Sequence, residues 1–262
     1  MNIRNKITGL FEIFRFDNWL SIISKTIFKP KSNLYLYIFK GKEYLLNKSG
    51  GDIPGFRTLL TSNEYKPFIK NLKLDESITL LDLGANVGVF PTLLSNFGFK
   101  IKKYVAVEYN TKTYYRLGVN ITSNYDFDYR LLNMAVVGYA RPVPASNTMG
   151  NTGENIFKEN TKSESKQVMR GITLDELYNE FFDNSDIIQL MKIDIEGAEY
   201  EIFENENYNM IKNCKYLLME IHNIVGKNKE NIFAKLEAKQ FENVEVKSNT
   251  NNKVYLFRNL NF

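Results

Sequence analysis

The amino-acid sequence predicts an α/β fold with a mostly parallel sheet that carries helices on both faces. From Ile78 onward, short apolar runs alternate with stretches of helical periodicity, and this alternation is typical of βαβ units. Glycines or acidic residues follow several of the apolar runs directly. Of the 262 residues, 44% are hydrophobic and 24% are charged, which is ordinary for a soluble globular protein able to bury a substantial core.

The regular elements of this second part of the chain follow from the same pattern. Strands are expected at residues 79–83, 104–108, 129–137, 187–193, 216–221, 244–247 and 253–257. Helices are expected at residues 90–97, 111–122, 174–182, 198–204 and 227–239. No helix separates the last two strands, which is compatible with an antiparallel pair at the edge of the sheet.

Residues 1–75 are predicted to form an N-terminal helix and hairpin extension, and residues 76–262 the main domain. Apolar residues at helical spacing from Ile3 to Ile27 indicate an amphipathic helix, which Pro30 ends. We expect this helix to pack on the domain or on a second copy in a homodimer. Peripheral contact with a membrane surface is the alternative.

The rest of the extension is expected to be a hairpin, a loop and one helix. Two β-rich runs at 34–39 and 43–46 flank a short glycine turn, which predicts the hairpin. The glycines and proline of residues 49–55 predict a loop, and residues 56–72 a helix.

Residues 139–170 are rich in Asn, Ser, Thr, Gly and Lys and have no clear periodicity. Irregular segments of this length are uncommon and often functional. We expect a lid or an acceptor-binding insertion here, with short extra strands.

Composition limits the compartment and the partners. Cys214 is the only cysteine, so no intramolecular disulfide forms, which fits a reducing compartment. There is no apolar run of about 18 residues and no compact signal-peptide pattern, so a cytoplasmic location is expected. The net charge of +4 is poor evidence for a nucleic-acid partner, and none is expected.

The loop after the first strand of the sheet is the strongest candidate for a cofactor site, because ligands of doubly wound sheets bind beyond the carboxyl ends of the strands. Its glycines, Gly84 and Gly88, are four apart and do not make a dinucleotide fingerprint. The carboxylate of Asp82 would repel a pyrophosphate but suits a cationic ligand. S-adenosylmethionine offers both an ammonium and a sulfonium group. The two glycines would let the backbone approach the cofactor.

Further acidic residues stand at the ends of later strands. Glu108 ends the second strand, where a carboxylate can accept hydrogen bonds from both ribose hydroxyls. Asp194 and Glu196 follow the fourth strand, and Glu220 and His222 stand at the end of the fifth. The dipole of the helix that follows the fourth strand would stabilise an acidic residue near its N-terminus. It does not explain why the strand leads directly into the Asp-x-Glu-Gly motif that begins at Asp194.

With these motifs in place, the chain resembles the FkbM-type methyltransferases. The resemblance covers roughly residues 78–222 and is carried by the segments at 81–88, 107–108, 133–136, 173–177, 192–199 and 220–222. It implies a Rossmann-like class I methyltransferase fold with a seven-stranded sheet ending in an antiparallel strand. It also implies S-adenosylmethionine-dependent O-methylation, often of sugar, glycan or natural-product hydroxyls.

Site roles follow from the resemblance and from the strand ends together. The expected cofactor-binding residues are Asp82, Gly84, Ala85, Asn86, Gly88, Glu108, Asn133, Ala135 and Asp194. The expected catalytic residues are His222, Asp194, Glu196 and Glu220. A hydroxyl acceptor must lose a proton, and we expect His222 or Asp194 to take it while Glu196 and Glu220 orient the sugar or the base.

Three alternatives stay open at this stage. We assign no metal ligands, although Asp194, Glu196 and Glu220 offer the oxygen donors that a divalent cation prefers. A nucleic-acid methyltransferase would need to flip and stack a base, and the chain lacks an Asn-Pro-Pro-Tyr-like motif and a basic strip. A non-catalytic binding or assembly protein that retains the cofactor fold is the remaining alternative.

Overall fold

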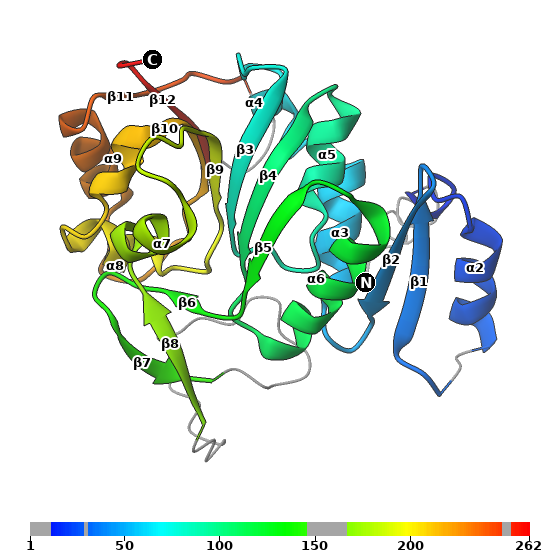
Figure 1. Ribbon diagram of the computed structural model, residues 1–262. Coiled ribbons are helices and arrows are strands. Elements are labelled where there is room, and N and C mark those ends of the chain that lie inside the picture. Colours follow the sequence, from blue (N-terminus) through cyan, green and yellow to red (C-terminus); the bar gives the residue numbers. More distant parts are fainter. Residues whose placement is uncertain (1–11, 29–30, 146–166, 248–252) are drawn as a thin grey trace.

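The computed structural model describes residues 12–28, 31–145, 167–247 and 253–262, and it confirms the α/β fold (Figure 1). Its main sheet has seven strands in the order β11-β12-β10-β9-β3-β4-β5. Strand β12 runs antiparallel to both of its neighbours, and the other pairs are parallel. The strands are β3 (Ser77–Leu83), β4 (Lys100–Val107), β5 (Asp128–Leu132), β9 (Ile188–Ile193), β10 (Cys214–Glu220), β11 (Phe241–Asn243) and β12 (Val254–Asn259).

The topological switch point of the sheet lies between β3 and β9. From β3 the chain continues outward through β4 and β5, and it then returns to place β9 on the other side of β3. In register, Leu81 of β3 therefore pairs with Val105 on one side and with Met191 on the other. The loops after β3 and β9 lead to helices on opposite faces of the sheet, which is the arrangement that forms the ligand crevice of this fold class.

Helices cover both faces of the sheet, as Figure 1 shows. Side chains alternate along each strand, so that Leu81 packs into the core beneath one face and Leu80 into the core beneath the other. The first face carries α7 (Leu174–Phe181), α8 (Glu199–Glu204) and α9 (Lys229–Ala238). The second carries α4 (Lys66–Ile69), α5 (Phe90–Asn96) and α6 (Thr111–Asn124).

Two of the predicted strands were wrong in extent. The strand expected at 129–137 breaks after Leu132, where Asn133 turns its amide onto backbone carbonyls. The residues that follow form β6 (Ala135–Val136), which pairs in another sheet. The strand expected at 244–247 lies earlier, at 241–243, because the buried ring of Phe241 anchors that segment in the core.

The extension contains α2 (Trp19–Phe28), the hairpin β1 (Leu34–Phe39) and β2 (Lys42–Asn47), and α3 (Asp52–Thr61). The hairpin is confirmed. One continuous helix up to residue 27 is wrong for the described part, because Asp17 and Asn18 leave the helix and bond to the hairpin backbone. Residues 3–11 of that prediction lie outside the described residues. Whether 1–75 is a separate domain stays a prediction.

The expected loop at 49–55 and helix at 56–72 were also wrong in their bounds. Helix α3 begins at Asp52, with Pro54 in its first turn, where a missing N–H costs nothing. The helix ends at Thr61, and the next residue, Ser62, takes an extended backbone and accepts a hydrogen bond from the N–H of Glu64 through its hydroxyl. Helix α4 then begins after Tyr65.

The extension is fastened to the main sheet by side chains of α6. Asn120 bonds to the backbone of both Leu45 and Val87, and Arg116 forms a buried ion pair with Asp52 at the start of α3. These contacts hold α3 against the loop that follows β3. None of the described helices is long and apolar enough to cross a membrane.

Short extra strands flank the irregular segment, as expected. β7 (Arg141–Pro144) and β8 (Val168–Ile172) pair antiparallel and join β6 in a three-stranded sheet. Residues 146–166 of the predicted insertion lie outside the described residues, and the lid role stays a prediction. On α2, Leu20, Ile27 and Phe28 are exposed, and the dimer and membrane contacts of that helix remain predictions.

Candidate functional site

The loop after β3 brings two strand ends into close contact. Gly84 has a φ of +76°, and a Cβ at this position would lie 1.8 Å from the backbone oxygen of Asp194. Only glycine allows this approach without moving the end of β9. Gly84 therefore fixes the distance between the β3 loop and the acidic segment that begins at Asp194.

Gly88 lies in close contact with α6. Its φ is +80°, and a Cβ would lie 2.7 Å from Leu117 and 3.0 Å from Ile121, both on α6. It borders neither of the two cavities described below. The role expected for Gly88, a close approach to the cofactor, differs from its place in the structure, where it admits α6 against the loop.

Asp82 is also set back from the site surface. Its side chain is fully buried and accepts a hydrogen bond from Tyr104 at 2.9 Å. Its other oxygen lies 3.4 Å from Nζ of Lys192, and burial raises the pKa of Asp82 despite this partner. The geometry gives Asp82 the role of holding Lys192, whereas direct contact with a cofactor was expected.

Glu108, after β4, is positioned through both of its carboxylate oxygens. Oε2 accepts from the backbone N–H of Asn86 at 2.9 Å, and Oε1 from that of Asn110 at 2.8 Å. Burial raises the pKa of Glu108 to about 7, against these hydrogen bonds. The loop after β3 and the start of α6 thus hold one carboxylate at the site, with lone pairs left for a ligand.

Asn133 acts on the backbone beside Glu108. Its amide nitrogen donates to the carbonyls of Glu108 and Tyr109, and its oxygen accepts from Thr111. These bonds brace the loop after β4. Asn133 lines neither cavity, whereas Met134 to Val136 line the Glu108 cavity, and the cofactor contact expected for Asn133 stays a prediction.

Two joined cavities open at these strand ends, and they share Gly55, Gly84, Asn86, Asp194 and Glu220. The Glu108 cavity has a volume of ≈ 200 Å³ and is lined in addition by Val107, Glu108, Tyr109, Asn110, Met134, Ala135, Val136, Ile195, Glu196 and Ala198. The Tyr65 cavity has a volume of ≈ 130 Å³ and is lined in addition by Phe56, Thr58, Leu59, Glu64, Tyr65, Ala85, Val87, Val89, Phe90 and Lys192.

Lys192 lies beneath the junction of the cavities. Its Nζ is 3.4 Å from Asp82 and 3.3 Å from Asp194, and it donates to the carbonyl of Gly84 at 3.1 Å. Burial opposes its charge, but the two carboxylates outweigh this and raise the pKa of Lys192 above its ordinary value. The ammonium group is therefore charged and already paired.

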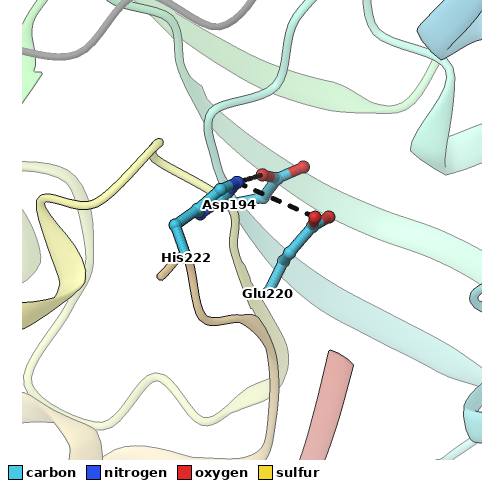
Figure 2. A group of neighbouring side chains, drawn as sticks. All are labelled: Asp194, Glu220 and His222. Carbon is cyan, nitrogen blue, oxygen red and sulfur yellow. Dashed lines mark ion pairs between the residues drawn. The ribbon is translucent and has the colours of Figure 1, made fainter. Parts of the chain in front are cut away.

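Four carboxylates surround His222 near the end of β10. Nδ1 lies 3.0 Å from Oε1 of the fully buried Glu199. Nε2 lies 3.4 Å from Glu196, 3.7 Å from Glu220 and 3.9 Å from Asp194. Figure 2 shows this edge of the ring turned toward the carboxylates of Asp194 and Glu220. The structure thus brings all four expected catalytic residues together.

The charges around His222 also shift its protonation. Burial disfavours the imidazolium, but the hydrogen bond to Glu199 and the charges of Glu199, Asp194 and Glu196 outweigh it and raise the pKa of His222 to about 9. Burial and the charge of Asp194 raise the pKa of Glu220 to about 7. The cluster as a whole favours a bound positive charge.

Tyr65 is a site residue that sequence reasoning missed. Its buried hydroxyl donates to Oε2 of Glu220 at 3.0 Å and lies 3.4 Å from Oδ2 of Asp194. It stands just before α4, far from any motif, and nothing in the sequence pattern marks it. Asn110 was missed as well, although an Asn that caps a helix two residues after a strand-end Glu is a readable signal.

A family model described as the methyltransferase FkbM domain matches residues 82–249. The chain belongs to this family. The match begins at Asp82, runs through the acidic segment after β9 and includes His222, so it contains most of the candidate site. It does not include Gly55 to Tyr65, the wall that the extension contributes to this FkbM-family chain. No curated protein is detectably similar in sequence.

A solved structure shares the fold at low sequence identity. An FkbM methyltransferase from Methylobacillus flagellatus is 13% identical with a TM-score of 0.50, over 78% of this chain and 47% of that one. The FkbM-family chain thus spans about half the length of that protein.

Two further structures align over similar shares of the chain. A protein of the NADB-Rossmann superfamily from Streptococcus agalactiae is 15% identical, with a TM-score of 0.46 over 76% of this chain and 68% of that one. TrmK from M. capricolum, in complex with S-adenosylhomocysteine, is 12% identical, with a TM-score of 0.39 over 76% of this chain and 67% of that one.

Proposed function

We propose that this chain is an S-adenosylmethionine-dependent methyltransferase that acts on a hydroxyl group of a sugar, glycan or natural product. One observation carries the proposal: the carboxyl ends of β3, β4, β9 and β10 converge on joined cavities with an acidic lining. Among the described residues, Lys192 is the only basic side chain in that lining, and it is paired. Such a lining favours a cationic cofactor and disfavours phosphate-bearing ligands.

The Glu108 cavity fits S-adenosylmethionine. Glu108 has lone pairs available for the ribose hydroxyls. Within the described structure, Oδ1 of Asn86 is buried and has no hydrogen-bond partner, and a buried acceptor of this kind is costly without a donor. The ammonium group of the cofactor is such a donor. Met134, Ala135 and Val136 offer a mainly apolar wall to the adenine ring.

The Tyr65 cavity is the proposed acceptor site. Its wall is apolar and aromatic at Phe56, Leu59 and Phe90, and its lining also includes Asp194 and Glu220. When bound, S-adenosylmethionine supplies an electrophilic methyl group on its sulfonium. The chain then has to align the acceptor oxygen, exclude water and accept a proton.

We assign these roles to the cluster at the junction. Asp194 and Glu220 border both cavities and so orient an acceptor hydroxyl. His222, in its neutral form, or Asp194 takes its proton, while Glu196 helps to hold the imidazole. His222 lines neither cavity and lies at the junction through its proximity to Asp194 and Glu220. A positioned base of this kind contributes about 10²–10⁴-fold to the rate.

The proposal is tested with the full-length protein, methyl-labelled S-adenosylmethionine and a panel of sugars, glycans, hydroxylated natural products and RNA. Transfer to a hydroxyl of a panel member is expected. His222→Gln should bind the cofactor normally but lower turnover about 10²-fold or more, whereas Glu237→Gln, on the exposed side of α9, should match the wild type. Transfer to RNA alone would overturn the acceptor class, and cofactor binding with no transfer to any member would favour a non-catalytic role.

A further inference from the structure

We propose that Asp194, Glu220 and His222 bind one divalent metal cation where the two cavities join. One ligand atom from each residue lies within 4.8 Å of the other two, and Figure 2 shows the three side chains converging. The role of the ion in orienting an acceptor rests on the proposed function. The binding of the ion does not.

The distances between the three atoms suit a shared ion. Nε2 of His222 lies 3.7 Å from Oε1 of Glu220 and 3.9 Å from Oδ1 of Asp194, too long for hydrogen bonds. Ligands about 2.0–2.2 Å from one cation are separated by roughly 3–4.4 Å. Both separations from Nε2 fall in that range, and the two carboxylate oxygens lie within 4.8 Å of each other.

The remaining polar atom of each residue is already committed, which leaves the three atoms facing one another. Oδ2 of Asp194 faces Lys192 at 3.3 Å, and Oε2 of Glu220 accepts from Tyr65 at 3.0 Å. Nδ1 of His222 is bonded to Glu199 at 3.0 Å. A histidine ligand that hydrogen-bonds a carboxylate through its other nitrogen is the usual arrangement at metal centres.

A second observation concerns the charge of Glu199. Its side chain is fully buried, and among the described residues its Oε2 has no hydrogen-bond partner. Its oxygen Oε1 accepts from the N–H of Ile195 and contacts His222. A buried carboxylate needs a compensating positive charge. Glu196 adds a further negative charge 3.4 Å from Nε2. The imidazolium of His222 supplies one positive charge, and a divalent ion in place of its Nε2 proton supplies two to the same cluster.

The donor set indicates the class of ion. Two carboxylates and one imidazole suit a divalent cation that accepts both oxygen and nitrogen ligands, of which Mn²⁺ is an example. Three protein ligands leave coordination positions open toward the cavities, where an acceptor oxygen would bind. An ion on Nε2 excludes that nitrogen as a base, so with the ion bound the roles given above change: His222 becomes a ligand, and Glu196, 3.4 Å from Nε2, becomes the candidate base.

The experiment measures Mn²⁺ binding to the full-length protein by electron paramagnetic resonance. One saturable site per chain is expected, with a nitrogen coupling in the electron spin echo that His222→Gln abolishes. Asp194→Asn and Glu220→Gln should each weaken binding at least tenfold. Glu204→Gln, which removes a surface carboxylate on α8 paired with Lys227, should bind Mn²⁺ as the wild type does.

Calorimetric titration with S-adenosylmethionine accompanies each variant and shows that the fold is retained. A wild-type chain that binds S-adenosylmethionine but has no saturable Mn²⁺ site would overturn the metal proposal and leave the proposed function intact. A chain that binds Mn²⁺ with the histidine coupling but does not bind S-adenosylmethionine would support the metal site and overturn the proposed function. Binding of Mn²⁺ without nitrogen coupling would also contradict the proposed ligand set.

Discussion

The hydroxyl of Tyr65 donates a hydrogen bond to Oε2 of Glu220 at 3.0 Å, although 155 residues separate the two in the chain. Tyr65 belongs to the N-terminal extension, and Glu220 ends strand β10. The extension is therefore part of the site and not an appendage to the sheet. The same contact places a protonated hydroxyl beside two carboxylates, because burial and the charges of Asp194 and Glu220 raise the pKa of Tyr65 well above its ordinary value.

Replacing Tyr65 with phenylalanine should affect stability and turnover but not cofactor binding. The loss of a buried hydrogen bond to a charged group should lower the free energy of unfolding by about 1.5–3 kcal/mol. Tyr65 lines only the Tyr65 cavity, so the dissociation constant for S-adenosylmethionine should change by less than about threefold, given that the substituted ring still fills the same volume. Urea unfolding and calorimetry measure the two effects.

Tyr178→Phe is the matched control for this substitution. Its hydroxyl donates to the carbonyls of Asp183 and Asp186, away from the site. Tyr178→Phe should lower the free energy of unfolding, yet leave turnover at the wild-type value. Equal turnover for the wild type and Tyr65→Phe would remove the hydroxyl of Tyr65 from the positioning of Glu220.

Cofactor affinity should depend on pH through Glu108. Burial raises the pKa of its carboxyl to about 7, and the ionised form makes the stronger hydrogen bonds to ribose. About one tenth of the carboxyl is ionised one pH unit below its pKa, so S-adenosylmethionine should bind roughly tenfold more weakly at pH 6 than at pH 8. Calorimetric titration across this range measures the dependence.

The stability of the unliganded chain should respond to Glu108 in the opposite direction. The folded state has the higher pKa, so it binds more protons than the unfolded state between the ordinary value of 4.5 and about 7. The contribution of Glu108 to stability is therefore greatest at low pH and is lost as the pH rises through this window. Glu108→Gln should flatten both dependences, and Glu237→Gln should preserve them. An affinity that is constant from pH 6 to 8 in the wild type would refute the assignment.

A series of glycine-to-alanine substitutions separates backbone strain from close approach. Gly98 has a φ of +89° and open space around it, so Gly98→Ala should cost only about 1 kcal/mol of stability. Gly88→Ala should cost about 1–3 kcal/mol more, because its Cβ meets Leu117 and Ile121 on α6. Gly84→Ala should lower the free energy of unfolding the most, because the added Cβ would overlap the backbone of Asp194. Chemical unfolding ranks the three variants.

The same series tests the site as well as the fold. Gly84→Ala displaces the end of β9 and should lower S-adenosylmethionine affinity by more than tenfold in protein that remains folded. Gly98→Ala should bind the cofactor normally. If Gly84→Ala and Gly98→Ala behaved alike in unfolding and in binding, the close contact between the β3 loop and Asp194 would not exist in solution.

Sequence reasoning was sufficient where one local pattern determines the outcome. Short apolar runs ending in Asp194 or Glu108 predict buried strands, and the sheet contains both. Sequence reasoning failed where an element ends because one side chain forms a hydrogen bond with a residue far away in the sequence. Asn133 ends β5 by bonding to the loop after β4, and Asp17 interrupts the first helix by bonding to the hairpin. Hydrophobic periodicity contains no information about such partners.

The candidate site shows the same limit. The cluster of Asp194, Glu196, Glu220 and His222 was predicted because adjacent parallel strands end at one edge of a sheet. Tyr65 was not, because its position depends on how α3 and α4 pack against α5 and α6. Asp82 was given a cofactor contact because it stands beside the loop, whereas the alternation of side chains along β3 turns it into the core toward Lys192.

Binding of S-adenosylmethionine to the purified chain tests the central claim most directly. Thermal unfolding is measured at increasing cofactor concentration, because a ligand that binds only the folded state raises the melting temperature as its concentration rises. The account predicts a rise that continues into the millimolar range and that is reduced in Glu108→Gln but not in Glu237→Gln. A melting temperature that does not change at millimolar S-adenosylmethionine would contradict it.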